Sequence, residues 1–534
     1  MSPPPPAPAD DSTEVAGRVD DERDRPAISA GRRGRPRALT AAVVLAAVLI
    51  VGAAAGLRLV DLAHQPGGLY PDEAAEGVTA HRILHDPGYH PLFIAEDAGR
   101  EPLYAYAVAG AFAVFGESTV TLRAVSAVLG VLGVLAIGLA LRRFGRGVVL
   151  AGMAWAAGSL WLVCVSRDGF RNVLVPLAGA IALAALIAWS DRPTRGRAIL
   201  AGAAVGAGLF TYQPLKLTPL LVVAWLWTLR RSNRPTYDAM VKHIRACVGG
   251  YLVVGGPMLY VALTDPANYF GRGAETSLFN RGNGHDSLVV HVVRTLGQFA
   301  FVGDPNARHN VGGAPLLSWP LAALAGVGAI VAWRRRQDPP YRLVLLGIVV
   351  FLVPPLLATE GSAPHFLRNL GLAPFVGALV AIGGVAVVSE LARRWRRWGW
   401  IAGVVALAAG LVATGALTAN AYFSRPVQDR YNAYSFALVA LARAADHGAS
   451  TAVIVDDYSA FDIDFLDSGH PPTQIRPGTR IANLRRFARV VAGSRSELAR
   501  AVGGAAAARA VVAARDPHGN PAVLVLTVSP TGAH

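Results

Sequence analysis

Apolar stretches long enough to cross a bilayer recur along most of the chain, and this repetition limits its possible folds more than any other feature. They run from Ala41 to Thr418, and each has about 18 residues or more, the length that a helix needs to span the hydrocarbon core. Of the 534 residues, 53% are hydrophobic and 16% are charged, whereas soluble globular domains carry about 25% charged residues. The sequence therefore predicts an α-helical polytopic membrane protein.

Short clusters of arginine separate the apolar stretches and predict the topology. Loops on the cytoplasmic side of a membrane collect Lys and Arg, so we place the clusters inside. This placement also accounts for the net charge of +15 without nucleic acid. The clusters are Arg32–Arg37, Arg142–Arg146, Arg192–Arg197, Arg230–Arg245, Arg334–Arg342 and Arg393–Arg397.

With these clusters inside, the chain has about eleven transmembrane helices, a cytoplasmic N-terminus and a C-terminus outside. The apolar stretch Leu103–Phe115 is short for a span and is bounded by Glu101 and Glu117, so we expect a juxtamembrane helix on the outer side. The predicted spans are roughly 39–60, 119–141, 147–164, 172–190, 197–212, 214–230, 244–263, 314–333, 341–358, 368–390 and 398–418.

Composition divides the chain into three regions. Residues 1–37 are rich in Pro, Asp and Ala and predict a disordered cytoplasmic tail. Residues 38–418 form the transmembrane domain, whose outer loops 61–118 and 264–313 carry most of the polar motifs. Residues 419–534 predict a small extracytoplasmic α/β domain. We expect its strands at 451–457, 508–516 and 521–528, and its helices at 434–445 and 496–502.

Acidic residues stand at two predicted helix starts in the first outer loop. In YPDEAAEG (70–77), Pro71 can open a helix, and Asp72 and Glu73 then lie where the helix dipole favours their charge. Glu101 has a similar place in GREPLYAY (99–106). Each acid could accept a proton from a hydroxyl, or it could simply cap its helix.

Four cations are predicted near the outer membrane boundary. Arg167 and Arg171 in SRDGFRN (166–172) are four residues apart and would share one face of a helical turn. Arginine binds phosphate through a planar fork, although pairing with Asp168 or another outer acid explains them equally well. Lys216 in YQPLK and Arg368 in SAPHFLRN complete the set.

Further polar residues in the outer loops are candidates for substrate binding. The motif FVGDPNARHN (301–310) offers oxygen and nitrogen ligands, but its spacing matches no strong metal signature. The two cysteines, Cys164 and Cys247, lie in apolar segments and indicate neither a metal site nor a disulfide. The candidates are Tyr70, Arg100, Tyr104, Asp304, Asn306, His309, Asn310 and His365.

Taken in order, these motifs resemble the glycosyltransferase C superfamily, in the branch that holds protein O-mannosyltransferases and bacterial aminoarabinose transferases. The resemblance covers about residues 40–390. It rests on Asp72–Glu73 after the first span, REPLY (100–104), FGESTVTLRAVSAVLG (115–130) and SRDGFRN. Aminoarabinose transferases have an acid, a base and Pro where this chain has Arg100, Glu101 and Pro102, so a metal site carried over from them is doubtful.

The resemblance implies a multi-pass enzyme of the cell membrane that takes a hexose or pentose from a polyisoprenyl-phosphate donor. It implies an inverting transfer to an acceptor hydroxyl on the outer face, with Asp72 as base and Glu73 and Glu101 as accompanying acids. Arg167, Arg171, Lys216 and Arg368 would bind the donor phosphate. No cofactor is certain, because family members differ in needing a divalent cation.

Two other functions compete with this prediction. A transporter or flippase of lipid-linked sugars would also carry many spans, but transporters often have internal repeats and polar residues at mid-membrane. A scaffold that binds cell-wall polymer through the C-terminal domain would leave Asp72 and the outer cations without a role. The sequence fixes neither the sugar, the acceptor (lipid, glycan or protein), the oligomeric state nor the role of the C-terminal domain.

Overall fold

The computed structural model describes Met1 and residues 35–528, except 97–98, 281–286, 359–362, 447, 449 and 468–470. The chain divides into two units, Met1–Ala46 and Ala47–His534, and the description below concerns the second. Helix α1 (Arg35–Leu59) runs from the first unit into the second. Most of the predicted tail over 1–37 lies outside the described residues.

Six helical segments of the described chain are long and apolar enough to cross a membrane, which agrees with the predicted membrane protein. They are Ala41–Leu59, Thr119–Phe144, Arg171–Asp191, Ile244–Thr264, Pro339–Leu357 and Leu370–Phe423. The last of these contains α17 (Ala373–Phe423), which is broken by non-helical backbone at Trp395 and Arg396. The break falls in the basic cluster between the last two predicted spans.

The other predicted spans coincide with shorter helices. Residues 147–164 form α5 (Arg146–Gly158) and α6 (Leu160–Val165). The remaining three are α8 (Arg195–Ala207), α9 (Thr218–Ser232) and α14 (Trp319–Arg334). The total of about eleven spans therefore stays a prediction, as does the orientation of the termini.

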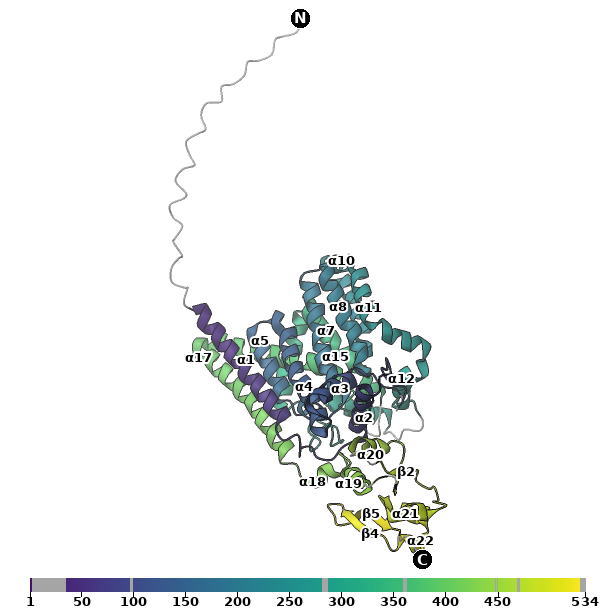
Figure 1. Cartoon of the computed structure of the whole chain (residues 1–534). Coiled ribbons are helices and arrows are strands. Elements are labelled where there is room, and N and C mark those ends of the chain that lie inside the picture. Colours follow the sequence, from purple (N-terminus) through teal and green to yellow (C-terminus); the bar gives the residue numbers. More distant parts are fainter. Residues whose placement is uncertain are drawn as a thin grey trace, which may run out of the picture. The chain divides into compact units, whose positions relative to one another are not determined.

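The helices of the membrane part and its loops that have not yet been labelled include those of the long apolar segments (Figure 1). They are α2 (Pro71–His85), α3 (Leu103–Phe115), α4 (Thr119–Leu141), α7 (Leu174–Asp191), α10 (Arg234–Val241), α11 (Ile244–Thr264), α12 (Pro266–Glu275), α13 (Leu288–Gly297), α15 (Pro339–Phe351) and α16 (Val353–Leu357).

Glycines let neighbouring helices approach closely in the membrane part. A Cβ atom added to Gly202 of α8 would lie 1.8 Å from the carbonyl oxygen of Cys247 on α11, and one added to Gly250 of α11 would lie 2.3 Å from that of Ile199. Close backbone contact through small residues is a common way to pack helices where lipid removes the hydrophobic driving force. These two glycines thus allow α8 and α11 to pack with their backbones in close contact.

The C-terminal domain, residues 424–528, contains one five-stranded sheet. Its order is β2-β1-β3-β5-β4, with β1 parallel to β2 and β3, and β5 antiparallel to β3 and β4. The strands are β1 (Thr451–Ile454), β2 (Thr473–Ile475), β3 (Arg489–Ala492), β4 (Val511–Arg515) and β5 (Pro521–Thr527). The structure confirms the predicted small α/β domain, although β2 and β3 were not predicted.

Helices cover both faces of this sheet. Alternate residues of β1 show this, because they are buried in two different hydrophobic clusters. Ala452 and Ile454 pack with α21 (Arg495–Val502) and α22 (Gly504–Ala507). Val453 packs instead with α19 (Phe436–Ala445) and α20 (Ala460–Leu466). The short helix α18 (Val427–Tyr431) joins α17 to this domain.

Helix α20 packs against α2, the helix that begins next to Asp72. A Cβ atom added to Gly77 would lie 2.3 Å from the ring of Phe465, and that ring stacks on Phe112 with the centroids 6.1 Å apart. The glycine therefore makes room for an aromatic side chain from the C-terminal domain. This contact brings the two parts of the second unit together beside the predicted base.

Candidate functional site

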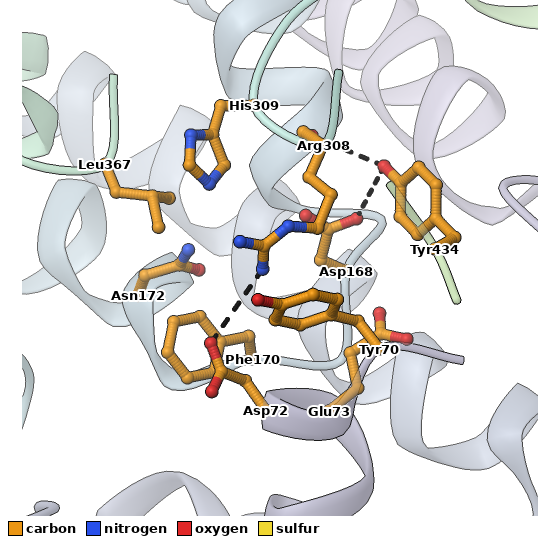
Figure 2. Close-up of a pocket in the computed structure, with 10 residues that line it drawn as sticks. All are labelled: Tyr70, Asp72, Glu73, Asp168, Phe170, Asn172, Arg308, His309, Leu367 and Tyr434. Atoms are coloured by element: carbon orange, nitrogen blue, oxygen red, sulfur yellow. Dashed lines mark hydrogen bonds and ion pairs between the residues drawn. The ribbon is translucent and has the colours of Figure 1, made fainter. Parts of the chain in front are cut away.

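Asp72 lies in the first turn of α2 and is nearly buried, with 6% of its surface exposed. The hydroxyl of Tyr458, from the C-terminal domain, donates a hydrogen bond of 2.8 Å to its Oδ1. The guanidinium of Arg308 lies 3.8 Å from Oδ2 and 3.4 Å from the centre of the Tyr70 ring. Figure 2 shows Arg308 above Tyr70, with its end directed at Asp72.

A small cavity lies beside this carboxylate. Ten residues from separate parts of the sequence line it (Figure 2). They come from the start of α2, the loop after α6, the 301–310 loop, the segment before α17 and the C-terminal domain. The structure therefore brings residues of YPDEAAEG, SRDGFRN, FVGDPNARHN and SAPHFLRN together at one place.

Glu73 points to different partners from Asp72. Its carboxylate forms a buried ion pair with Arg123 at 2.6 Å and accepts a hydrogen bond of 2.7 Å from the backbone N–H of Gly169. Breaking a buried pair of this kind leaves an uncompensated charge and is strongly destabilising. These contacts fasten α2 to α4 and to the SRDGFRN loop.

A second group of charges surrounds Glu101, which is 1% exposed. Lys216 lies 3.1 Å and Arg171 lies 3.6 Å from its carboxylate. Arg171 also pairs with Glu76 at 2.9 Å, and burial raises the pKa of Glu76. Two of the predicted phosphate ligands, Arg171 and Lys216, are thus neighbours, and both contact the acid predicted to act beside Asp72.

Arg100 adds unused hydrogen-bond donors near this group. It is 1% exposed, and one of its nitrogens donates to Thr79 at 3.4 Å. Within the described chain, its Nε and Nη1 have no hydrogen-bond partner. Buried donors without partners are costly, so an anion bound here would be favoured.

The two other predicted phosphate ligands differ from each other. Arg368 is buried and donates to the Tyr212 hydroxyl at 3.0 Å. Arg167 instead donates to three backbone carbonyls, those of Leu57, Val60 and Gln65, at 2.8–3.0 Å. Since Arg167 already ties the end of α1 to the following loop, we leave it out of the phosphate set proposed below.

The 301–310 loop is held by its own polar residues. Asp304 accepts hydrogen bonds from Nδ1 of His309 at 3.0 Å, from the N–H of Phe366 at 2.6 Å and from the N–H of Asn306 at 2.8 Å. Asn310 donates to the carbonyls of Asp304 and Ala314, both at 2.9 Å. Asp304, Asn306 and Asn310, which were predicted to bind substrate, therefore fix the shape of the loop that carries Arg308. His309, from the same loop, lines the cavity.

Tyr104 has a structural environment as well. It is fully buried, and its hydroxyl donates to the Leu122 carbonyl at 2.9 Å and lies 2.8 Å from Oγ of Ser126. Both partners belong to α4. The hydroxyl thus joins α3 to α4, and substrate binding by Tyr104 stays an untested prediction.

Two groups of side chains in the described chain are close enough to share a metal ion. One is buried and consists of Asp304, His309 and His365, and the other is exposed and consists of His81, His85 and Glu117. Burial lowers the pKa of His309 to about 4. Although burial opposes it, the hydrogen bond from His309 lowers the pKa of Asp304. A carboxylate beside a neutral imidazole suits a divalent cation.

Sequence reasoning missed four residues of the site. Arg308 lies inside the GDPNARHN motif, and Asp168 lies inside SRDGFRN, so both motifs gave a signal. Burial, followed by the charge of Glu73, raises the pKa of Asp168 to about 8, and Tyr434 donates to its carboxylate at 3.1 Å. Tyr434 and Tyr458 belong to a region with no motif, so only the three-dimensional contacts reveal them.

Comparison with known proteins identifies the fold. Residues 95–260 match the family model for dolichyl-phosphate-mannose-protein mannosyltransferases. No protein with curated annotation matches the sequence.

Solved structures match over most of the chain. A crystal structure of ArnT from Cupriavidus metallidurans bound to undecaprenyl phosphate has a TM-score of 0.59 and 15% identity, covering 93% of this chain and 100% of ArnT. The archaeal oligosaccharyltransferase AglB from Archaeoglobus fulgidus, in complex with an inhibitory peptide and a dolichol-phosphate, has a TM-score of 0.54 and 13% identity. That match covers 90% of this chain and 74% of AglB.

The family match spans the second half of the predicted first outer loop and several spans after it, and the structural matches extend over the rest. This agrees with the resemblance inferred from the order of the motifs. The chain therefore has the fold seen in ArnT and AglB, which is that of the GT-C glycosyltransferases.

Proposed function

We propose that this chain is a membrane glycosyltransferase that moves a sugar from a polyisoprenyl-phosphate donor to an acceptor hydroxyl. The fold supports this proposal. So do the solved structures with that fold, since ArnT was crystallised with undecaprenyl phosphate and AglB with a dolichol-phosphate. The transfer inverts the sugar and takes place on the outer face of the cell membrane.

The observation that carries the proposal is the environment of Asp72. Its carboxylate is nearly buried at a helix start, borders a cavity and already accepts a hydrogen bond from a hydroxyl, that of Tyr458 at 2.8 Å. A general base must lie within hydrogen-bond reach of the proton it removes. An acceptor hydroxyl in the place of the tyrosine hydroxyl would meet this requirement.

The chemistry needs one base and several cations. Asp72 takes the proton of the acceptor hydroxyl while the acceptor oxygen attacks the anomeric carbon of the sugar. The bond from that carbon to the phosphate oxygen breaks, and the polyprenyl phosphate leaves with the electron pair. Because phosphate is a good leaving group, the step requires charge stabilisation of the departing oxygen and no general acid.

We assign that stabilisation to Arg100, Arg171, Lys216 and Arg368. All four are cations from the outer motifs, and all are buried or nearly buried. Glu101 holds Arg171 and Lys216 together through its two ion pairs. Arg308, stacked on Tyr70, orients the Asp72 carboxylate.

Substitution of Asp72 tests the proposal. Asp72→Asn keeps the shape of the side chain but removes the base, so it is expected to abolish transfer of labelled sugar from polyprenyl phosphate in membranes, while donor binding and thermal stability stay near wild type. The second variant, Glu73→Gln, is expected to lower thermal stability because it breaks the buried pair with Arg123, and to retain part of the activity.

Comparing the two variants distinguishes loss of the base from loss of folded protein. Near-wild-type turnover by the Asp72→Asn protein would remove Asp72 from the role of base. Turnover lost in both variants with equal loss of folded protein would show only that α2 is needed for structure.

A further inference from the structure

Three side chains from two elements converge on the exposed end of α2. His81 and His85 are one helical turn apart on that helix, and Glu117 lies in the turn between α3 and α4. Nδ1 of His81 lies 2.7 Å from Oε2 of Glu117, and Nε2 of His85 lies 2.6 Å from Oε1. One carboxylate thus faces two imidazoles at once.

The three side chains lie at the protein surface. The side chains of His81 and His85 are 54% and 56% exposed, and that of Glu117 is 33% exposed. Fixing exposed side chains in one geometry costs conformational entropy, and exposed ion pairs return little stability. Three of them directed at one point therefore suggest a ligand that all three bind.

The spacing and the donor types identify the class of ligand. Residues i and i+4 of a helix lie on the same face, and two histidines so spaced, completed by a carboxylate from another element, form a familiar Zn²⁺ ligand set. One nitrogen of each histidine and an oxygen of Glu117 all lie within 4.8 Å of one another. Water would complete a tetrahedral site.

We propose that His81, His85 and Glu117 form a divalent transition-metal site with Zn²⁺ as its preferred ion. The site lies outside the Asp72 cavity, since His81 and His85 stand 9 and 13 positions after Asp72 along α2, which corresponds to about 14–20 Å at 1.5 Å per residue. The metal would fasten the far end of α2 to the turn that joins α3 and α4. It thereby supports the helix on which Asp72 stands, independently of the sugar transfer.

The test measures zinc on the full-length protein in detergent, first stripped with a chelator and then titrated with ZnSO4. We expect one zinc per chain that is lost with His85→Gln and with Glu117→Gln, each weakening binding by about tenfold or more, the lower limit seen even for residues behind a metal ligand. Zinc should raise the melting temperature of the wild type but not of these variants.

A matched control is available at His64. This exposed histidine also faces a carboxylate, Asp61, at 2.6 Å, but the described chain places no second imidazole in a shared metal set with it. His64→Gln should therefore bind zinc like the wild type. Stripped protein that takes up no zinc at micromolar concentration would refute the site.

Two other results would also refute it. Zinc bound equally well by the wild type, His85→Gln and Glu117→Gln proteins would place the ion elsewhere. Zinc that survives in those variants but disappears with His309→Asn would assign it to the buried group of Asp304, His309 and His365.

Discussion

At the scale of single residues, two groups contact the carboxylate of Asp72, one at each oxygen. The hydroxyl of Tyr458 donates to Oδ1, and the guanidinium of Arg308 lies near Oδ2. The cation is itself held flat on Tyr70, which fixes its direction. Because each oxygen of Asp72 has a defined neighbour, the carboxylate is held in one orientation. A fixed base is needed if the acceptor hydroxyl is to be held in one reactive position.

Lys216 tests the proposed binding of the donor phosphate. Lys216→Met removes the cation but keeps most of the side chain, so donor use should weaken by about 1–3 kcal/mol, the value of a hydrogen bond to a charged group. Kinetics at varied polyprenyl-phosphate-sugar concentration would measure this as a higher KM for the donor. Lys242→Met, at an exposed lysine in the predicted cytoplasmic cluster, should behave like the wild type. An unchanged donor KM for Lys216→Met would remove this lysine from the set.

Many residues of the candidate site could be predicted one by one from the sequence. The residues that the prediction missed or misassigned have physical reasons. A carboxylate after proline at a helix start, or an arginine on a predicted outer loop, departs from what packing alone needs and is visible in the sequence. Arg167 has the same signal as Arg171, yet it binds carbonyls of the chain itself. The sequence cannot distinguish an arginine that binds a phosphate from one that binds backbone carbonyls, because both kinds of partner satisfy the hydrogen-bond donors of the guanidinium.

At the scale of elements, helix α20 and the two residues before it, Tyr458 and Ser459, form a segment of the C-terminal domain that covers one side of α2. Phe465 fills the space over Gly77, and Tyr458 reaches the carboxylate. In this arrangement the tyrosine hydroxyl occupies the place that the proposed reaction gives to the acceptor. The covering segment must therefore yield when an acceptor binds.

Tyr458→Phe should reveal this competition. Without the hydroxyl, no hydrogen bond has to be broken before the acceptor binds, so we expect the KM for the acceptor to fall by about two- to tenfold, in line with a net hydrogen-bond contribution of about 0.5–1.5 kcal/mol. The value of kcat should remain unchanged. A fall in kcat at constant KM would instead give Tyr458 a part in the chemistry.

Asp462 on α20 should make stability depend on pH. It is fully buried, its carboxyl oxygens have no hydrogen-bond partner within the described chain, and burial, with the charge of Glu73, raises its pKa from 3.8 to about 8. Since the folded state then binds the proton more tightly than the unfolded state, stability falls as the pH rises from about 4 to about 8.

Asp462→Asn removes this titration. We expect its melting temperature to exceed that of the wild type increasingly as the pH rises through that window, with Asp429→Asn, at an exposed carboxyl, as the control. Parallel melting curves for the wild type and Asp462→Asn would contradict the assignment.

Elements were predictable where one physical signal dominates. The basic cluster at 393–397 separated two apolar stretches, and α17 breaks there at Trp395 and Arg396. The short strands β2 and β3 carried no such signal, because three or four residues hold too little alternation to distinguish a strand from a loop. Their pairing with β1 depends on contacts distant in the sequence.

At the scale of the whole molecule, the predicted topology places α3 beside the membrane on the outer side. A 13-residue helix is about 20 Å long at 1.5 Å per residue, well short of a bilayer core of about 30 Å. Cysteines introduced one at a time at His90 and Glu117, on either side of α3, should therefore react with an impermeant thiol reagent added from outside.

Arg143→Cys should react only after the membrane is opened, because its cluster is predicted inside. Cys164 and Cys247 are buried and should give little background. Labelling of position 90 but not of position 117 from outside would mean that α3 crosses the membrane, and the outer motifs would then lie on opposite sides.

The last part of the chain is bound to the loops that come first. Arg430 donates to the carbonyl of Pro66 at 2.6 Å and to Oε1 of Gln65 at 2.8 Å. Arg425 donates to the carbonyl of Ala307 in the loop that carries Arg308, and Tyr434 meets Asp168. The C-terminal domain is thus a wall of the site rather than an appendage.

This has a consequence for the order in which the ribosome makes the protein. Synthesis runs from the N-terminus, so the helix with Asp72 is made early. The residues that complete its surroundings, Arg425, Tyr434 and Tyr458, are translated several hundred residues later. A nascent chain or a fragment cut before Arg425 has the base without its finished cavity. We therefore expect the proposed transfer to begin only on a chain translated beyond Arg425 and Tyr434, which would keep unfinished copies from consuming lipid-linked sugar.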